Sequence, residues 1–288
     1  NPMNDLDETS GLFHFPLARR GFVMTSLVSG FTLATTTVEA QAIHTDTEGL
    51  VADEVQIPVS DGHLPGYFAR PAQGTGFPTI LVIEEASGVN EYIRDVCRRF
   101  AKAGYLAVAP EIYARLGDLS KMTDMSAVFR DVIAKAPDAQ IMSDLDSAAA
   151  WAAANHGDAA RLGVNGFCRG GRDVWLYAAH NPHLKAAVSW YGILDGKASP
   201  IQPQTALDVS DKLLCPLLGL YGGQDPNNPL PLVHEAEDKA KAAGKTVEIV
   251  IYPDAPHAFH ADYRPSYREA DAKDGWTRAL GWFHRWGV

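Results

Sequence analysis

Short apolar runs alternate with amphipathic stretches along the chain from residue 50 onward. Residues 54–59 alternate polar and apolar side chains, which predicts a half-buried strand with residues 64–69 as its hairpin partner. Continuous apolar runs predict buried strands at 79–83, 105–109, 161–165, 186–190, 216–221 and 246–252. Apolar residues at helical spacing predict helices over 90–103, 138–155, 173–180, 231–243 and 267–286.

This alternation of strands and helices predicts an α/β fold, with a mostly parallel sheet that helices cover on both faces. No internal repeat or compositional break follows residue 50, so we expect a single domain over residues 43–288. Residues 111–137 are the least periodic part of that domain. They are expected to form an insertion or cap over the functional site, or else a surface loop.

Residues 1–42 have a different pattern from the rest of the chain. Arg19-Arg20 precedes a mildly apolar stretch over 23–33, and Ala40-Gln41-Ala42 ends the segment with a small-x-small site. This pattern is typical of a twin-arginine export signal and predicts a periplasmic protein; the alternative is a surface helix in a cytoplasmic one. The leading region is acidic, which departs from the export pattern. The apolar stretch is too short and Thr-rich for a membrane span.

The composition limits the classes of protein that fit. With 46% hydrophobic and 21% charged residues, the chain is neither a disordered polar tail nor a multi-span membrane protein. A net charge of −10 without any long basic run argues against nucleic acid as a partner. Three cysteines are too few for a disulfide scaffold, and their odd number leaves at least one free thiol.

One of these cysteines lies in a motif for a nucleophile. Residues 165–171 read Asn-Gly-Phe-Cys-Arg-Gly-Gly, follow a predicted strand and open a predicted helix. This is the Gly-x-nucleophile-x-Gly elbow with Cys168 in place of serine, and a helix N-terminus favours a thiolate. Cys97 and Cys215 lack flanking glycines and are expected to be buried structural residues.

A base and its acid follow the elbow in the chain order of α/β-hydrolases. His257 lies on a loop after one predicted strand, and Asp225 follows a Gly-Gly pair at the end of another. His257 would take the thiol proton, and Asp225 would hold the imidazole in the required tautomer. Asp195 and Asp254 are less well placed alternatives for the acid.

The pattern His257-x-x-His260-x-Asp262 could instead suggest metal ligands. It lacks the His-Glu-x-x-His spacing and any further ligand cluster, so we expect no metal and no cofactor. His260 is then expected to lie behind the site or at the surface.

The loop after the predicted strand at 79–83 supplies the other half of the expected site. The backbone amide of Ala86, together with that of Arg169 next to the nucleophile, would hold an oxyanion. Glu84 and Glu85 are adjacent, and side chains alternate along an extended chain. Only one of the two can therefore face Cys168.

Five motifs together resemble the dienelactone hydrolase (carboxymethylenebutenolidase) family. They are Glu85-Ala-Ser-Gly-Val-Asn90, Pro110-Glu-Ile-Tyr-Ala-Arg115, Gly166-Phe-Cys-Arg-Gly-Gly171, Tyr221-Gly-Gly-Gln-Asp225 and Pro256-His-Ala-Phe259, and the resemblance spans residues 50–288. It implies an α/β-hydrolase fold, a Cys168–Asp225–His257 triad, and turnover of a small ester or lactone through an acyl-thioester. It also implies that Glu85 pairs with the resting, largely neutral thiol until substrate displaces it.

Four positions depart from the family's usual pattern, one of them Arg169, which follows Cys168 where Leu or Trp is common. Ala86 and Ser87 stand where larger apolar residues are common, and Ala261 stands where the best-known lactonases carry an arginine. We therefore expect a wider, less cationic pocket that favours neutral short-chain esters or lactones. Ser87 is expected to contact substrate, and Tyr191 matches a pocket aromatic of the family, with a core role as its alternative. The cations that could replace the missing arginine are Arg130, Arg169 and Arg264.

Two other functions remain open from the sequence. The same scaffold could hydrolyse other acyl or phosphoryl esters, because a fold does not determine its chemistry. The second alternative is a non-catalytic binding protein of this fold, which the complete set of Cys168, Asp225 and His257 disfavours.

Overall fold

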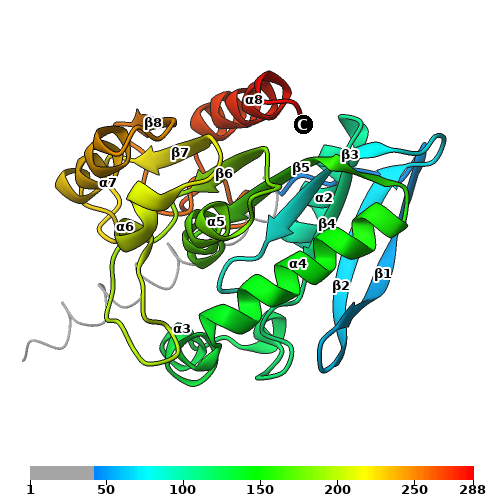
Figure 1. The fold of residues 1–288 in the computed structure, drawn as a ribbon, viewed down its shortest axis with the longest axis horizontal. Helices are drawn as coiled ribbons and strands as arrows, with labels where there is room; N and C mark the ends of the chain where they lie inside the picture. Colours follow the sequence, from blue (N-terminus) through cyan, green and yellow to red (C-terminus); the bar gives the residue numbers. More distant parts are fainter. Residues whose placement is uncertain (1–41) are drawn as a thin grey trace, which may run out of the picture. The chain divides into compact units, whose positions relative to one another are not determined.

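The computed structural model describes residues 42–288, so the predicted export signal at 1–42 lies outside the described residues except for Ala42. In this part of the chain, eight strands form one sheet (Figure 1). In chain order they are β1 (Leu50–Val59), β2 (Gly62–Pro71), β3 (Phe77–Ile83), β4 (Leu106–Pro110), β5 (Gly157–Phe167), β6 (Ala186–Trp190), β7 (Leu217–Gly222) and β8 (Val247–Tyr252).

The strands lie in the order β1-β2-β4-β3-β5-β6-β7-β8 across the sheet. β1 pairs with β2 and β2 with β4 in antiparallel register, whereas all other neighbouring strands are parallel. The hairpin and the mostly parallel sheet expected from the sequence pattern are therefore confirmed, in an arrangement consistent with the α/β-hydrolase fold.

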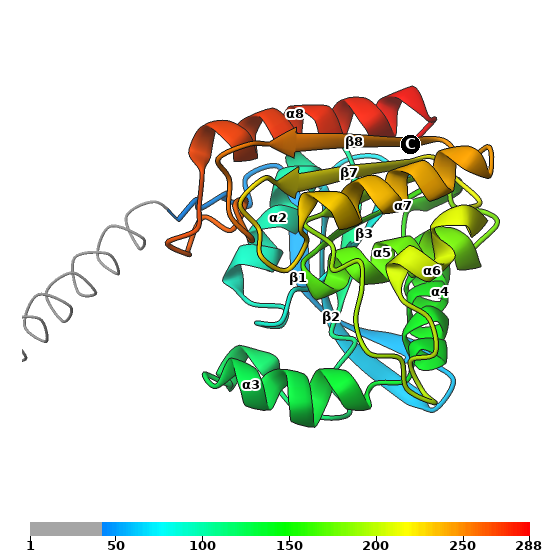
Figure 2. The same cartoon turned by 90° about the vertical axis from the view of Figure 1, so that its left-hand side faces the viewer.

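Helices cover both faces of this sheet (Figure 2). The longer ones are α2 (Glu91–Lys102), α4 (Asp138–Ala154), α5 (Arg169–His180), α7 (Leu230–Ala242) and α8 (Glu269–Arg285). Two further helices, α3 (Met125–Ala127) and α6 (Ala206–Val209), are single short turns.

The continuous apolar run of β3 contributes side chains to two hydrophobic clusters, one on each face of the sheet. Ile80 and Val82 lie in the cluster that includes residues of α2 and α8. Leu81 and Ile83 lie in the other cluster, which includes residues of α4, α5 and α7. Side chains of a strand alternate between its faces, so a strand covered on both sides needs a continuous apolar run.

Several boundaries differ from the predicted ones. In the structure, β1 begins at Leu50 and β5 at Gly157, both earlier than predicted. The prediction missed these first residues because they are largely exposed and do not follow the apolar pattern of the rest of each strand. α5 begins at Arg169, directly after Cys168, rather than at Asp173. Residues 111–137 contain short helical turns at Leu119–Lys121, Met125–Ala127, Val128–Val132 and Ile133–Lys135.

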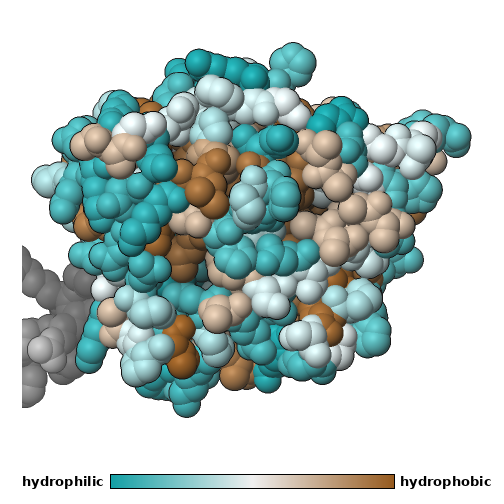
Figure 3. All heavy atoms as spheres, in the orientation of Figure 1, coloured by the Kyte–Doolittle hydropathy of each residue, from teal (hydrophilic) through white to brown (hydrophobic). Residues whose placement is uncertain are grey.

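The surface of the described part is mixed in character. On the face seen in Figure 3, hydrophilic side chains are interspersed with hydrophobic ones. Between residues 42 and 288, no helix is long and apolar enough to cross a membrane.

Candidate active site

The carboxyl ends of the parallel strands lie at one edge of the sheet. Ile83 at the end of β3 pairs with Gly166 of β5, and Phe167 pairs with Trp190 of β6. β7 and β8 end together in the same way. The segments that follow these strand ends carry the predicted site residues Glu85, Cys168, Tyr191, Asp225 and His257.

The turn between β5 and α5 is as tight as the glycine pattern requires. Cys168 has φ +56° and ψ −115°, a strained conformation for a residue with a side chain. A Cβ on Gly166 would lie 2.4 Å from the carbonyl oxygen of Gly170, and one on Gly170 would lie 2.4 Å from that of Glu84. Only glycine therefore fits at these two positions. The close contact at Gly170 also brings the loop after β3 next to the nucleophile candidate.

Cys168, His257 and Asp225 form a continuous hydrogen-bonded chain. The Sγ of Cys168 lies 3.1 Å from Nε2 of His257, and Nδ1 of His257 lies 2.7 Å from Oδ2 of Asp225. An ionised carboxylate can only accept, so Nδ1 donates to Asp225 and Nε2 faces the sulfur. The alternative acids, Asp195 and Asp254, are exposed.

Asp225 is buried and held by its own loop. It accepts hydrogen bonds from the backbone N–H of Asn227 (2.8 Å) and from Nδ2 of Asn228 (3.1 Å). Asn228 also accepts from the backbone N–H of Leu194 (3.2 Å), so it ties the Asp225 loop to the segment after β6. Burial raises the pKa of Asp225, but the hydrogen bond and charge of His257 outweigh burial and lower that pKa.

The His257 imidazole is electrostatically coupled to both neighbours. Burial lowers the pKa of His257, but Asp225 and Cys168 outweigh burial and raise this pKa to about 10. A ring with such a partner on each side can take and return a proton without turning. Tyr191 is fully buried and packs edge-on against the ring, with centroids 5.1 Å apart, so it shapes the wall behind the base.

The amides predicted to hold an oxyanion are both available. Arg169 is the first residue of α5, so its N–H has no partner within the helix. Ala86 lies in a turn that the Gly88 N–H closes on the Glu85 carbonyl (3.1 Å). Among residues 42–288, neither the Ala86 nor the Arg169 amide donates to a protein acceptor, which leaves both for a ligand.

A hollow of about 220 Å³ lies over these groups. Its lining residues are Glu85, Ala86, Met125, Phe129, Cys168, Ile193, Asn227, His257, Ala258 and Arg264. Met125 and Phe129 come from the aperiodic segment 111–137, so part of this segment borders the candidate site. A larger hollow of about 630 Å³ beside α4 contains none of the predicted site residues.

The two adjacent glutamates point in different directions, as expected. Glu84 is buried and accepts from the backbone N–H of Ile112 (2.8 Å), and burial raises its pKa well above the usual range. Glu85 lines the hollow, but its Oε1 accepts from the Tyr263 hydroxyl and from Nη2 of Arg264 (3.1 Å). Within residues 42–288, no hydrogen bond joins Glu85 to Cys168, so the pairing implied by the resemblance is absent from this arrangement.

Of the three arginines named as possible replacements for the missing one, Arg264 borders the hollow. Its guanidinium also donates to Oγ of Ser87 (2.6 Å). Arg130 is exposed, pairs with Asp131 (2.9 Å) and does not line the hollow. The direction of Arg264 depends on the path of the loop after His257, which the residue pattern does not specify.

His260 is buried rather than at the surface. Its Nδ1 lies 2.6 Å from the Tyr92 hydroxyl, and burial and nearby Arg99 lower its pKa well below the usual range. Within residues 42–288, no group of three or more His, Cys, Asp or Glu side chains is placed to hold a metal ion. Cys97 and Cys215 are buried, as expected.

Comparisons with known proteins identify the family of the chain. A model described as the Dienelactone hydrolase family matches residues 64–287. A Methylorubrum extorquens protein, provisionally named a carboxymethylenebutenolidase, is 52% identical over 99% of this chain and 98% of its own length. An Escherichia coli K12 protein with the same provisional name is 47% identical, over 91% of this chain and 97% of its own.

Solved structures give the same result. A crystal structure provisionally described as a dienelactone hydrolase from Klebsiella pneumoniae is 49% identical, with a TM-score of 0.80 over 82% of this chain and 99% of that one. A dienelactone hydrolase-like promiscuous phosphotriesterase from metagenomic libraries is 19% identical, with a TM-score of 0.70 over 83% of this chain and 100% of that one, and shares the fold. From the family match and these relatives, the chain belongs to the dienelactone hydrolase family, a group of hydrolases that act on lactones or esters.

Proposed function

We propose that the protein hydrolyses neutral esters or lactones by covalent catalysis at Cys168. The observation that carries this proposal is the chain from Sγ of Cys168 to Nε2 of His257 (3.1 Å) and from Nδ1 to Asp225 (2.7 Å). A thiol beside a base, with an acid that orients the base, is the arrangement that nucleophilic catalysis needs.

In the first half-reaction, the thiol proton lies on Nε2 of His257, and Sγ of Cys168 bonds as a thiolate to the carbonyl carbon. The resulting oxyanion accepts hydrogen bonds from the backbone amides of Ala86 and Arg169. When the intermediate collapses, the carbon–oxygen bond to the leaving group breaks and His257 protonates the departing alkoxide. The product is an alcohol, or the open hydroxyl of a lactone, and a thioester on Cys168.

In the second half-reaction, water replaces the alcohol. His257 takes a proton from water, the hydroxide bonds to the thioester carbon, and the same two amides hold the oxyanion. Collapse breaks the carbon–sulfur bond, and the proton returns from His257 to Sγ. The acid is released and no cofactor is consumed.

The charges in the hollow favour neutral substrates. Arg264 is its cation, but Glu85 already pairs with that guanidinium, so a substrate carboxylate would have to displace the glutamate. An unpaired carboxylate beside buried Glu85 would be costly, because like charges repel strongly where water is excluded. The hydroxyl of Ser87 accepts from the same Nη2 of Arg264 and so helps to hold the cation in this position.

A pair of matched lactones, one neutral and one carrying a carboxylate, tests this preference. The parent enzyme is expected to have a higher kcat/KM for the neutral lactone. Glu85→Gln frees the Arg264 charge and should shift the kcat/KM ratio toward the carboxylate by about tenfold, which corresponds to about 1.4 kcal/mol. A parent that prefers the carboxylate-bearing lactone tenfold or more would contradict the proposal.

Removal of the nucleophile tests the activity itself. Cys168→Ala should lower kcat/KM for esters by at least about a thousandfold while the fold is retained, because a triad without its nucleophile keeps only residual catalysis. Cys215→Ala, at a buried thiol away from the hollow, is the control. Activity above about 10% of the parent's in Cys168→Ala would rule out the proposed nucleophile.

The same assay separates the two alternative functions. A panel of aryl esters, lactones and phosphotriesters should show turnover of the carboxylic substrates first. Faster hydrolysis of phosphotriesters would identify a phosphoryl hydrolase on this scaffold. Binding of an activated ester without any burst of product would indicate a non-catalytic binding protein.

The N-terminal segment supports a further part of the proposal, that the protein is exported to the periplasm by the twin-arginine route. The support is Arg19-Arg20 followed by a weakly apolar stretch and a small-x-small site. Changing both arginines to lysine should leave the protein in the cytoplasmic fraction, measured by immunoblot. An unchanged periplasmic yield would contradict export by this route.

A further inference from the structure

The hollow over Cys168 has a lining of two kinds. Its polar members are Glu85, Cys168, Asn227, His257 and Arg264. Its apolar members are Ala86, Met125, Phe129, Ile193 and Ala258. The mechanism proposed above uses polar side chains and the Ala86 amide, but it gives no role to the side chains of Met125 and Phe129.

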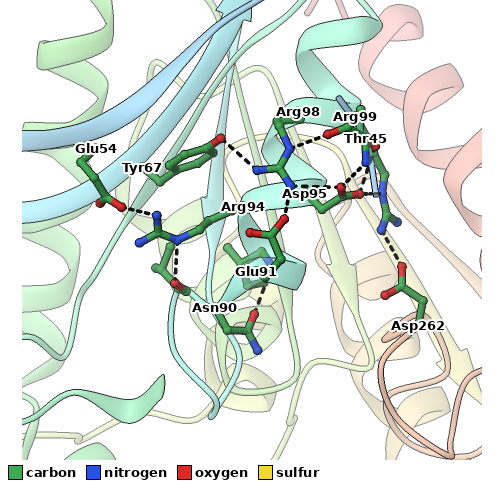
Figure 4. A network of polar contacts seen from close by, with 12 residues as sticks. Thr45, Glu54, Tyr67, Asn90, Glu91, Arg94, Asp95, Arg98, Arg99 and Asp262 are labelled. Carbon is green, nitrogen blue, oxygen red and sulfur yellow. Dashed lines mark hydrogen bonds and ion pairs between the residues drawn. The ribbon is translucent and has the colours of Figure 1, made fainter. Parts of the chain in front are cut away.

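The loops that carry most of the polar lining are held by α2 (Figure 4). Nε of Arg94 in this helix donates to the carbonyl of Val89 (3.3 Å), in the loop after β3. Nη2 of Arg99, one turn further, donates to buried Asp262 (2.5 Å) in the loop that carries His257. These supports lie outside segment 111–137, so a change in that segment leaves them in place.

Met125 and Phe129 belong to one continuous helical run over 125–135. Its central part, Val128–Val132, is a π-helical turn, a rare form that occurs frequently at functional sites. Val128 and Val132 are four residues apart and both are buried in the core. Met125 and Phe129 are also four apart and so share a second helix face, which borders the hollow.

This second face leaves apolar surface uncovered. Met125 is 37% exposed, and Phe129 is half-buried, packing in part against the core. A substrate group that covers these side chains removes apolar area from water, which favours binding. The unbranched side chain of Met125 can also adapt its shape to such a group.

We propose that Met125 and Phe129 are specificity-determining residues, which contact an apolar group of the ester or lactone and limit its length. This inference deepens the proposed function and rests on it. The hollow of about 220 Å³ is smaller than the roughly 300–1,000 Å³ of common ligand pockets. The preferred substrate therefore carries a compact apolar group, such as a short acyl chain or a small lactone ring, and not a long chain.

Two series of esters test this limit. In the first, acyl chains from acetyl to octanoyl are joined to one alcohol; in the second, the acetyl group is joined to alcohols from methanol to octanol. The parent should have its highest kcat/KM at the short end of the series whose variable group contacts Met125 and Phe129. A shift in the first series identifies this group as the acyl chain, and a shift in the second identifies it as the alcohol.

Substitutions at Phe129 should move this profile in both directions. Phe129→Ala makes room and should raise the ratio of kcat/KM for the longest ester to that for the shortest by about tenfold, the size expected for one more methylene group in an apolar pocket. Phe129→Trp adds bulk at the same place and should lower the ratio. A loss of stability alone would not produce opposite shifts.

Met122→Ala is the matched control, because Met122 lies in the same segment and packs against the same core but does not line the hollow. Its chain-length profile should equal the parent's. Met125→Ala provides a second test and should also raise the ratio, even if Phe129→Ala does not fold. Thermal unfolding identifies the variants that are folded.

An unchanged ratio in both series for Phe129→Ala and Met125→Ala would overturn the inference. Shifts in the same direction for Phe129→Ala and Phe129→Trp, or an equal shift in Met122→Ala, would do so as well. In these cases ester turnover persists, so the proposed catalysis at Cys168 is unaffected. A parent without any ester turnover would instead contradict the proposed function, and this inference with it.

Discussion

His257 lies between a sulfur and a carboxylate, and its protonation state depends on both. Its folded pKa of about 10 lies above the ordinary value of 6.5 because Asp225 and Cys168 outweigh burial. A raised pKa means that the protonated ring stabilises the fold below about pH 6.5 and that this contribution is lost as pH rises toward 10. In the proposed mechanism, the same coupling keeps a proton available for the leaving group.

Asp225→Asn should lower the pKa of His257, because the buried ring loses its negative partner. The expected fall is about 1 to 3 pH units, the usual effect of an opposite charge in contact. Titration of the His257 ring protons by NMR measures this value, with the exposed Asp254→Asn as control. An unchanged pKa in Asp225→Asn would show that Asp225 does not control the base.

Glu84 makes stability fall with rising pH in the same direction as His257, because burial and then nearby Glu111 raise its pKa. A carboxyl whose folded pKa exceeds 4.5 stabilises the fold fully below that pH and loses this contribution as pH rises through the folded value. Glu84→Gln stays neutral, so its Tm should gain on the parent's between pH 5 and pH 8. Thermal unfolding of both proteins across this pH range is the measurement, with exposed Glu235→Gln as control. A Tm difference between Glu84→Gln and the parent that does not change with pH would contradict the account.

At the scale of elements, the turn between β5 and α5 depends on backbone contact at Gly170. Gly170→Ala would place a methyl group 2.4 Å from the Glu84 carbonyl oxygen, so backbone must move. We expect destabilisation of about 1 to 3 kcal/mol and a loss of activity, as for other overpacked sites. Exposed Gly196→Ala, where a Cβ meets nothing within 4 Å, should change the unfolding free energy by less than about 1 kcal/mol. Equal unfolding midpoints of the two variants in urea would be evidence against a tight turn.

The elements differ in how far the sequence predicts them. The glycines around Cys168 mark the elbow because only close backbone contact requires such spacing. The start of β5 is missed because its first residues are partly or fully exposed, and among them Gly157 pairs with Phe77 before the register shifts. Segment 111–137 is equally difficult, since its short turns take their stability from contacts with the rest of the fold.

At the scale of the whole molecule, the parallel sheet explains why the residues of the candidate site could be predicted to lie together. Cys168, Asp225 and His257 are far apart in sequence, but each follows a strand whose end lies at the same edge. The bond between Glu85 and Arg264 could not be predicted in this way, because it depends on two loop paths rather than on a strand register. The contact of Asn228 with Asp225 could not be predicted either, because it also depends on the path of a loop.

Residues 43–288 are proposed to unfold as one domain, with 111–137 as a cap on it. Both hydrophobic clusters include residues of the same strands, so loss of one exposes the other. Thermal unfolding followed by near-ultraviolet and far-ultraviolet circular dichroism should therefore give coincident single transitions. Two separated transitions would indicate that the cap or another part folds independently.

The central claim is that an acyl group is carried on the sulfur of Cys168. Rapid acid quench during turnover of an activated ester, followed by intact-protein and peptide mass spectrometry, measures this directly. We predict an added acyl mass on the peptide that contains Cys168, formed and lost at rates consistent with kcat, and absent in Cys168→Ala. Full turnover without any adduct, or an adduct on another residue, would contradict the account.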